Sequence, residues 1–236
     1  MISLLQNFVV TKQDRLNTLK ETLQYIAKYF NDINFYVNYN SKINFKEVYS
    51  LYEDNVSDLT FYNDLTKDWG KIVQSMISEI DSKYIFIMPE DYILYNNDES
   101  YFNNLIEELN KYDCDHMIMH RIEYVKNYGT DEKYFHLYDE KDYLFLCNSD
   151  KYPTSSLSSV AIYKKDFLNE YLTYYNAQPK NTRFPLETPN CYEWFSYERV
   201  SEYSKIGRTD SRMFAVPKKS IVKHYEPNDI KERRFQ

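Results

Sequence analysis

Residues 83–94 constrain the fold most, because this stretch joins a short apolar run to two acids. Residues 84–88 are all apolar or aromatic, which at this length is typical of a strand buried on both faces of a sheet. Pro89 ends the run, and Glu90 and Asp91 follow it directly. Ligands of open α/β sheets bind just outside the carboxyl ends of the strands. The acids therefore fit either a divalent-metal or ribose site or a solvated turn, and this stretch alone favours neither.

The segments around the acids alternate between strand and helix patterns. Apolar residues spaced three and four apart predict helices within 16–30 and 68–80, with strands at 2–10, 34–39 and 59–62 and a short helix or loop at 45–52. This order predicts an α/β fold with a mostly parallel central sheet flanked by helices. Further helices are expected at 101–109, 167–175 and 188–200, and further strands at 116–122, 143–147, 159–163, 213–216 and 221–224.

Composition and charge exclude several classes of protein. The chain has 3 glycines and contains neither GxxxxGK[ST] nor GxGxxG, which excludes P-loop kinases and ordinary dinucleotide-binding enzymes. A formal net charge of −7 disfavours a general nucleic-acid binder, because phosphate contacts need a basic surface. The 3 cysteines form no CxxC pair, so neither a disulfide framework nor a structural zinc site is indicated. The chain shows neither a basic leader nor a run of transmembrane length, and we expect a cytoplasmic protein.

Several short motifs together resemble the GT-A glycosyltransferases, especially the small family 2-like members of bacterial or viral type. They are a first strand leading to TKQDR at 11–15, a strand ending near Asn38, DWGK at 68–71, MPED at 88–91 and SSVAIYKKDF at 158–167. The resemblance covers roughly 2–98 in element order and 156–224 more loosely. It implies a Rossmann-like GT-A fold in one domain, with a nucleotide-sugar-binding half (1–98), an acceptor-side half (99–224) and a tail (225–236).

The resemblance implies a divalent metal at the acids. The family's signature is usually Asp-x-Asp, whose last Asp holds the cation that bridges the donor diphosphate, but Pro89 stands where the first Asp would be. Either Asp91 is the ligand and Glu90 supplements it, or metal binding is weakened. Mn²⁺ or Mg²⁺ suits such a site because both ions prefer oxygen ligands. A late histidine completes the metal shell in many such enzymes, so His224 is a candidate ligand, with a structural histidine as the alternative.

The resemblance also implies positions for the nucleotide. Thr11 and Arg15 would flank the base and the diphosphate, and Asn38 would hydrogen-bond the base. Trp69 and Lys71 would line the ribose-phosphate side. Charged donors suit a diphosphate because charge-assisted hydrogen bonds are about twice as strong as neutral ones. Trp69 fits equally well as an apolar contact at the start of a helix.

An inverting transfer needs a general base within reach of the acceptor hydroxyl, and a carboxylate is the usual choice. Glu193 is the candidate, because it lies in the first turn of the helix predicted after the proline-containing segment 178–189. Glu187 and Glu198 are rivals, and an exposed structural acid is an equally good interpretation. A retaining enzyme would need no such base.

The sequence thus favours a metal-assisted glycosyltransferase that moves a sugar from a nucleoside-diphosphate sugar to a hydroxyl of a glycan or related acceptor. Two alternatives stay open. One is a non-catalytic module of the same fold that binds a glycan or a partner. The other is a nucleotidyltransferase, against which the lack of a Gly-rich, Lys-containing loop after the first strand counts.

Overall fold

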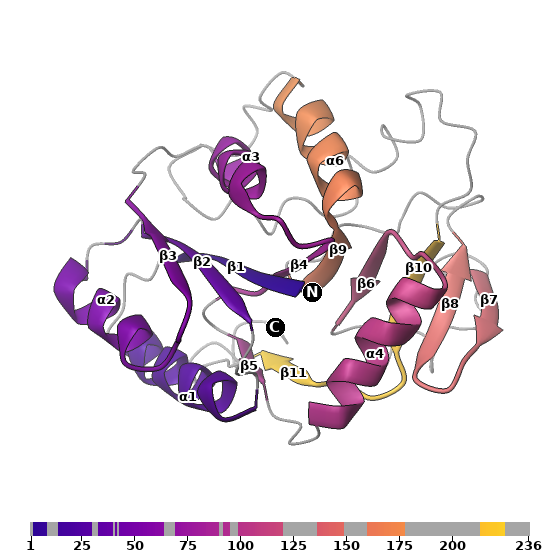
Figure 1. Ribbon diagram of the computed structural model, residues 1–236, viewed down its shortest axis with the longest axis horizontal. Coiled ribbons are helices and arrows are strands. Elements are labelled where there is room, and N and C mark those ends of the chain that lie inside the picture. The colour runs from indigo at the N-terminus through magenta and orange to yellow at the C-terminus, as the bar shows by residue number, and fades with distance from the viewer. Residues whose placement is uncertain are drawn as a thin grey trace, which may run out of the picture.

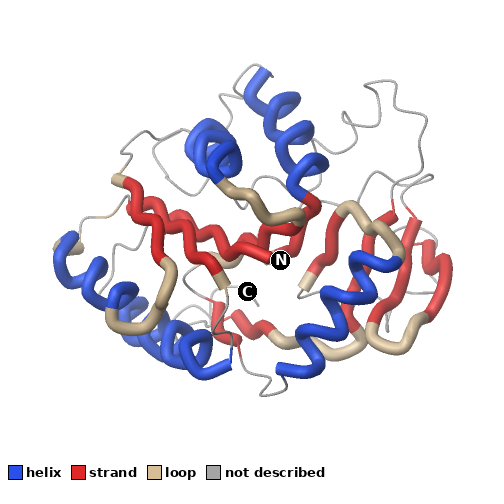
Figure 2. The backbone as a smooth tube through the Cα atoms, viewed as in Figure 1, coloured by secondary structure: helices blue, strands red, loops and turns tan. Residues whose placement is uncertain are grey.

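The computed structural model describes residues 2–8, 14–29, 33–39, 41, 43–63, 69–89, 92–94, 99–119, 136–148, 160–177 and 213–224. Within these residues the chain forms one nine-stranded sheet with helices on both faces, and a separate two-stranded sheet (Figures 1 and 2). The α/β class and the helix-flanked central sheet are therefore confirmed. In the part of the chain described, no helix has both the length and the apolar character needed to span a membrane.

The first half of the large sheet is parallel. Its strands lie in the order β3-β2-β1-β4. β4 pairs with β1 on one side and with β9 on the other, and it is fully buried because its side chains point alternately into apolar cores on the two faces of the sheet. The elements of this half are β1 (Ile2–Phe8), α1 (Asp14–Tyr29), β2 (Asn34–Tyr39), α2 (Phe45–Glu53), β3 (Leu59–Tyr62), α3 (Trp69–Glu79) and β4 (Tyr84–Ile87).

The second half of the large sheet is mixed. It continues from β4 in the order β9-β6-β10-β8-β7, and β9 and β8 run antiparallel to their neighbours. The other strands described in this sheet share one direction, which agrees with the mostly parallel sheet predicted. The elements of this half are α4 (Glu99–Lys111), β6 (His116–Ile118), β7 (His136–Glu140), β8 (Leu144–Asn148), β9 (Ala161–Lys164), α6 (Lys165–Ala177) and β10 (Met213–Pro217).

Two apolar cores lie on opposite faces of this sheet. Helices α1, α2 and α4 cover one face, and α3 and α6 cover the other (Figure 1). Successive residues of a strand point to opposite faces, so Leu4 of β1 belongs to the first core and Leu5 to the second. This alternation explains why β1 carries apolar residues at consecutive positions.

The two-stranded sheet consists of β5 (Tyr92–Leu94) and β11 (Val222–His224), which pair antiparallel. The sequence predicted a late strand at 221–224 but no strand at 92–94. Figure 1 shows β5 and β11 beneath the main sheet, on the side of α1. The segment 83–94 therefore contains two strands, which belong to two different sheets.

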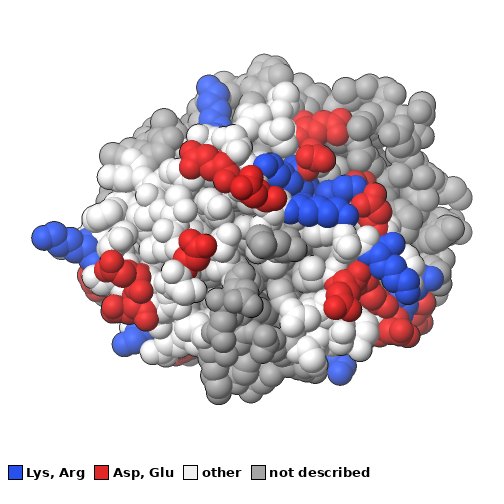
Figure 3. Space-filling model, viewed as in Figure 1, with Lys and Arg blue, Asp and Glu red and all other residues white. Residues whose placement is uncertain are grey.

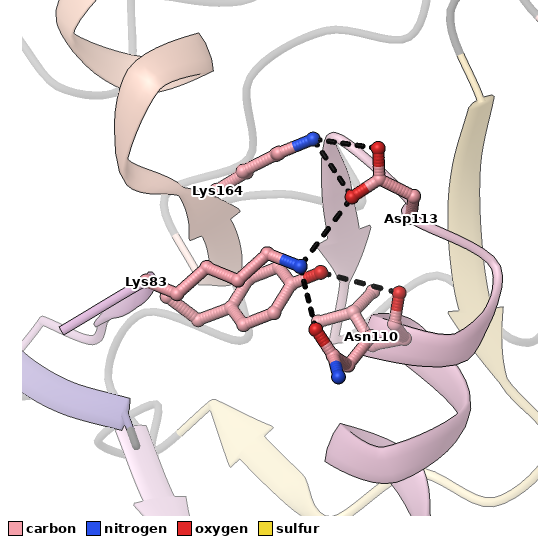
Figure 4. Close-up of polar contacts among 6 residues, drawn as sticks. Lys83, Asn110, Asp113 and Lys164 are labelled. Carbon is pink, nitrogen blue, oxygen red and sulfur yellow. Dashed lines mark hydrogen bonds and ion pairs between the residues drawn. The ribbon is translucent and has the colours of Figure 1, made fainter.

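Asp113, in the turn after α4, forms ion pairs with Lys83, just before β4, and with Lys164 of β9 (Figure 4). Asp113, with a φ of 49°, accepts from Lys164 Nζ at 2.8 Å and lies 3.4 Å from Lys83 Nζ. Lys83 also donates to Asn110 Oδ1 at 2.5 Å. Both lysines hold the pKa of the Asp113 carboxyl below its usual value, and the Lys164 hydrogen bond contributes most. On the face of the molecule that Figure 3 shows, basic and acidic side chains are interspersed.

Candidate active site

The chain that leads into the acids is held by β1. Met88 directly follows β4 and is 1% exposed. Its N–H donates to the Leu5 carbonyl at 3.3 Å, and its own carbonyl accepts from Gln6 Nε2 at 3.1 Å. Both polar groups of the Met88 main chain are thus bonded to neighbouring residues of one strand. Pro89 therefore leaves the sheet from a fixed point.

Gln6 joins three elements through its side-chain amide. It is 1% exposed within β1, and its Oε1 accepts a hydrogen bond from the Tyr52 hydroxyl of α2. Its Nε2 donates to the Met88 carbonyl at the end of β4. A buried amide needs such partners, because an unsatisfied donor or acceptor is costly in an apolar core. The side chain links β1, α2 and the residue before the acidic segment.

The chain that leaves the acids is held by α1. The Tyr92 N–H donates to the Pro89 carbonyl at 3.3 Å, and the Tyr92 carbonyl accepts from Thr22 Oγ1 at 2.9 Å. Thr22 is 1% exposed and lies in α1, the helix that packs against β5. Glu90 and Asp91 themselves lie outside the described residues. Met88, two residues before the acids, and Tyr92, directly after them, are hydrogen-bonded to β1 and α1.

The pairing of β5 with β11 brings a late histidine to this place. His224 is directly opposite Tyr92 in the antiparallel register, and opposed residues of such a pair have Cα atoms about 4.5–5.5 Å apart. The backbone of His224 therefore lies close to the residue that follows Asp91. Its side chain is not described. His224 and Tyr92 are far apart in the sequence, and the pairing of β5 with β11 brings them side by side.

The residues predicted for the nucleotide gather at the same edge of the sheet by topology. β1, β2, β3 and β4 are parallel, so the segments that follow their carboxyl ends meet at one edge. Asn38 lies near the end of β2, Arg15 in the first turn of α1 after β1, and Trp69 and Lys71 at the start of α3 after β3. Thr11 lies outside the described residues.

Asn38 and Lys71 differ sharply in how accessible their side chains are to solvent and to a ligand. The Asn38 side chain is completely buried, and its backbone is in register with Asn7 of β1 and Tyr62 of β3. A base could reach Asn38 only if the groups above it moved aside. Lys71 is exposed and needs no such movement. The side chains of Arg15 and Trp69 are not among those described.

The predicted general base and its rivals, Glu193, Glu187 and Glu198, all lie outside the described residues. Within the described part of the chain, no group of three or more His, Cys, Asp and Glu side chains could hold a metal ion. Glu90 and Asp91 are not among these described residues.

Sequence reasoning did not select Gln6, Thr22 or Tyr52. One signal was available for Gln6, because Ile2, Leu4 and Gln6 share one face of β1 and the polar residue interrupts an apolar row. Thr22 and Tyr52 lie on helices, and their hydroxyl partners could not be deduced from spacing.

No protein-family model matches the sequence, and neither does any protein of curated function. Solved structures do match its fold. S. aureus TarS 1–349, a GT-A-type glycosyltransferase, matches in its complex with UDP with a TM-score of 0.54 at 12% identity over 98% of this chain. The complex of TarS 1–349 with UDP-GlcNAc matches with a TM-score of 0.54 at 10% identity over 96% of this chain. This chain spans 62% and 59% of those two TarS chains.

A second kind of neighbour belongs to the nucleotidyltransferases. The 4-diphosphocytidyl-2C-methyl-D-erythritol synthase of Anaerococcus prevotii matches with a TM-score of 0.53 at 11% identity, over 98% of this chain and 93% of that one. A CMP-2-keto-3-deoxy-manno-octonic acid synthetase complexed with CTP matches with a TM-score of 0.51 at 6% identity, over 99% and 97%. At these identities the likeness shows the fold alone, which is the α/β fold of GT-A-type glycosyltransferases and of these nucleotidyltransferases.

Proposed function

We propose that this protein is a metal-assisted glycosyltransferase that transfers a sugar from a nucleoside-diphosphate sugar to a hydroxyl of a glycan or related acceptor. The observation that carries the proposal is the register of β11 on β5, which sets His224 opposite Tyr92. A histidine is thus opposite the residue that follows the acidic pair in the sequence, and the strand before the pair ends at the carboxyl edge of the parallel strands, where α/β proteins bind ligands. The TarS complexes with UDP and UDP-GlcNAc support a nucleotide-sugar donor.

Asp91, supplemented by Glu90, and His224 are the proposed ligands of Mn²⁺ or Mg²⁺. The donor set fits such an ion, because carboxylate oxygens are its preferred ligands and imidazole is acceptable to Mn²⁺. The hydrogen bonds to Met88 and Tyr92 hold described residues on either side of the acids, which supports a metal site at this place. The ion, when bound, would offset the negative charge that develops on the departing diphosphate.

The chain's other residues are proposed to bind the donor and to move a proton. Thr11 and Arg15 would contact the base and diphosphate, and Trp69 and Lys71 the ribose-phosphate side. Asn38 is proposed as a base contact that becomes available when the donor enters. If the transfer is inverting, Glu193 accepts the proton of the acceptor hydroxyl as that oxygen attacks the sugar carbon.

A nucleotidyltransferase is the second candidate, because both neighbours of that kind are covered over 93% or more of their length. The two reactions release different products. A glycosyltransferase releases a nucleoside diphosphate from a nucleotide sugar, whereas a nucleotidyltransferase releases pyrophosphate from a nucleoside triphosphate. A non-catalytic binding module would release neither.

Calorimetry with Mn²⁺ and a panel of UDP- and GDP-sugars tests the proposal directly. We expect metal-dependent binding of at least one sugar nucleotide, and loss of that binding in Asp91→Asn. Asp166→Asn, which changes an exposed acid in the first turn of α6, is the matched control and should bind as the wild type does. Absence of binding at millimolar concentrations would overturn the proposal. Pyrophosphate release from a nucleoside triphosphate would favour the second candidate instead.

A further inference from the structure

We propose that Gln6 and Thr22 are positioning residues for the Glu90-Asp91 pair, and that they act by holding the main chain on either side of it. The inference rests on the proposed function, because it assigns these two buried side chains a role in metal binding. Neither residue touches the proposed metal. Each donates to a carbonyl of a residue that flanks the acids, Gln6 to Met88 and Thr22 to Tyr92.

The two hydrogen bonds are similar in length, although the Gln6 bond is buried and the Thr22 bond is partly buried. Their lengths are 3.1 and 2.9 Å, and each donor residue is 1% exposed. They come from different elements, since Gln6 belongs to β1 and Thr22 to α1. Met88 and Tyr92, which stand on either side of residues 89–91, therefore each accept a hydrogen bond from a buried side chain.

A metal site needs this kind of support. Metal ligands must be held within about 0.5 Å of a productive geometry, and loss of an outer-shell partner typically weakens metal affinity about 10–100-fold. Tyr92 is also the residue opposite His224. The Thr22 hydrogen bond should therefore influence the position of both the acids and His224. Gln6 should influence the position of the acids alone, because it donates to Met88 at the end of β4.

Gln6 further connects the acids with α2. The Tyr52 hydroxyl donates to Gln6 Oε1, and α2 follows β2, whose end carries Asn38. A shift of α2 when a base enters beside Asn38 would therefore reach Met88 through two hydrogen bonds. Metal affinity and nucleotide affinity should accordingly be coupled through Gln6.

A purely structural role would give a different pattern, and Ser3 provides the comparison. Ser3 lies in the same strand as Gln6, is fully buried, and shares a 2.7 Å hydrogen bond with the buried Ser82. That bond lies at the amino end of β1, away from the acids. Ser3→Ala therefore removes a buried hydrogen bond of β1 without affecting the proposed positioning.

The experiment measures Mn²⁺ binding by electron paramagnetic resonance, with Mn²⁺ alone and with UDP added, alongside urea denaturation. Gln6→Met and Thr22→Val should weaken Mn²⁺ binding by about tenfold or more. Thr22→Ser, which keeps the hydroxyl, should bind Mn²⁺ as the wild type does. Ser3→Ala should lose stability but keep the wild-type affinity. In Gln6→Met the gain in Mn²⁺ affinity on adding UDP should also diminish.

The outcomes separate this inference from the function on which it rests. Wild-type protein that binds no Mn²⁺, with or without UDP, would overturn both. Wild-type binding that Thr22→Val and Gln6→Met leave unchanged would overturn the positioning role alone. Thr22→Val replaces the hydroxyl by a methyl group, whereas Thr22→Ser keeps the hydroxyl and loses the methyl group, so comparing the two decides the matter even if Gln6→Met does not fold. An equal loss of affinity in Ser3→Ala would also contradict the inference.

Discussion

His116 is a titratable residue whose burial in the core keeps it uncharged. It is 1% exposed, and its ring stacks against Phe167 at 5.4 Å and Tyr163 at 5.9 Å between centroids. Burial lowers its pKa from 6.5 to about 3. These features fit a structural role for His116 in the core.

The lowered pKa predicts that His116 makes the protein less stable in mild acid. Between pH 6.5 and about 3 the unfolded state binds a proton at this residue and the folded state does not, so stability falls as the pH falls through this window. From pH 7 to pH 5 the residue should account for a loss of about 2 kcal/mol. His116→Phe keeps an aromatic ring and should lose that much less between the two pH values. Urea denaturation at pH 7, 6 and 5 measures the difference, and parallel curves for the two proteins would contradict it.

At the scale of elements, one carboxylate of α4 organises the hairpin of β7 and β8. Glu108 is 9% exposed and accepts from three consecutive backbone N–H groups, of Asp142 at 3.2 Å, Tyr143 at 3.0 Å and Leu144 at 3.1 Å. Hydrogen bonds to a charged group each contribute about 1.5–3 kcal/mol. The acid therefore binds the start of β8 to the helix beside it.

Glu108→Gln should destabilise the protein by about 2–3 kcal/mol, because the amide keeps only one of the two acceptor oxygens. Hydrogen exchange should show the greatest local loss of protection at Tyr143 and Leu144. Glu107→Gln, on the exposed side of the same helix, is the matched control and should change stability by less than about 0.5 kcal/mol. Equal effects of the two substitutions would show that the three hydrogen bonds do not stabilise the hairpin.

The elements that sequence analysis predicted are those whose own residues specify them. β2 was predicted with its observed bounds, and β4 as a fully buried strand, because a short apolar run is itself the signal. β5 and β7 were not predicted. β5 has 3 residues and pairs with the distant strand β11, whereas β7 reads HLYDE, which carries little apolar pattern, and pairs with the next strand, β8. The candidate site divides in the same way. Its acids were predicted from the local pattern at the strand end and His224 from the resemblance to a known family, whereas Gln6 and Thr22 depend on partners that only the tertiary structure supplies.

At the scale of the molecule, β9 is the strand that joins the two halves of the large sheet. It pairs with β4 on one side and with β6 on the other. Ile162 of β9 is fully buried and lies in register with Phe86 of β4 and Met117 of β6. The parallel half and the mixed half of the sheet therefore share one continuous core through this residue.

If the chain is one domain, Ile162→Ala should destabilise both halves together, by about 2–5 kcal/mol. Ile162→Val removes one methylene group and should cost about 0.5–1.5 kcal/mol with the same distribution. Native-state hydrogen exchange measures the opening free energies of β2, in the parallel half, and of β8, in the mixed half. A single cooperative unit requires that both fall by equal amounts in each variant, because all of its amides exchange through the same global unfolding. A fall confined to β8 would mean that the halves unfold independently and that β9 merely lies between two domains.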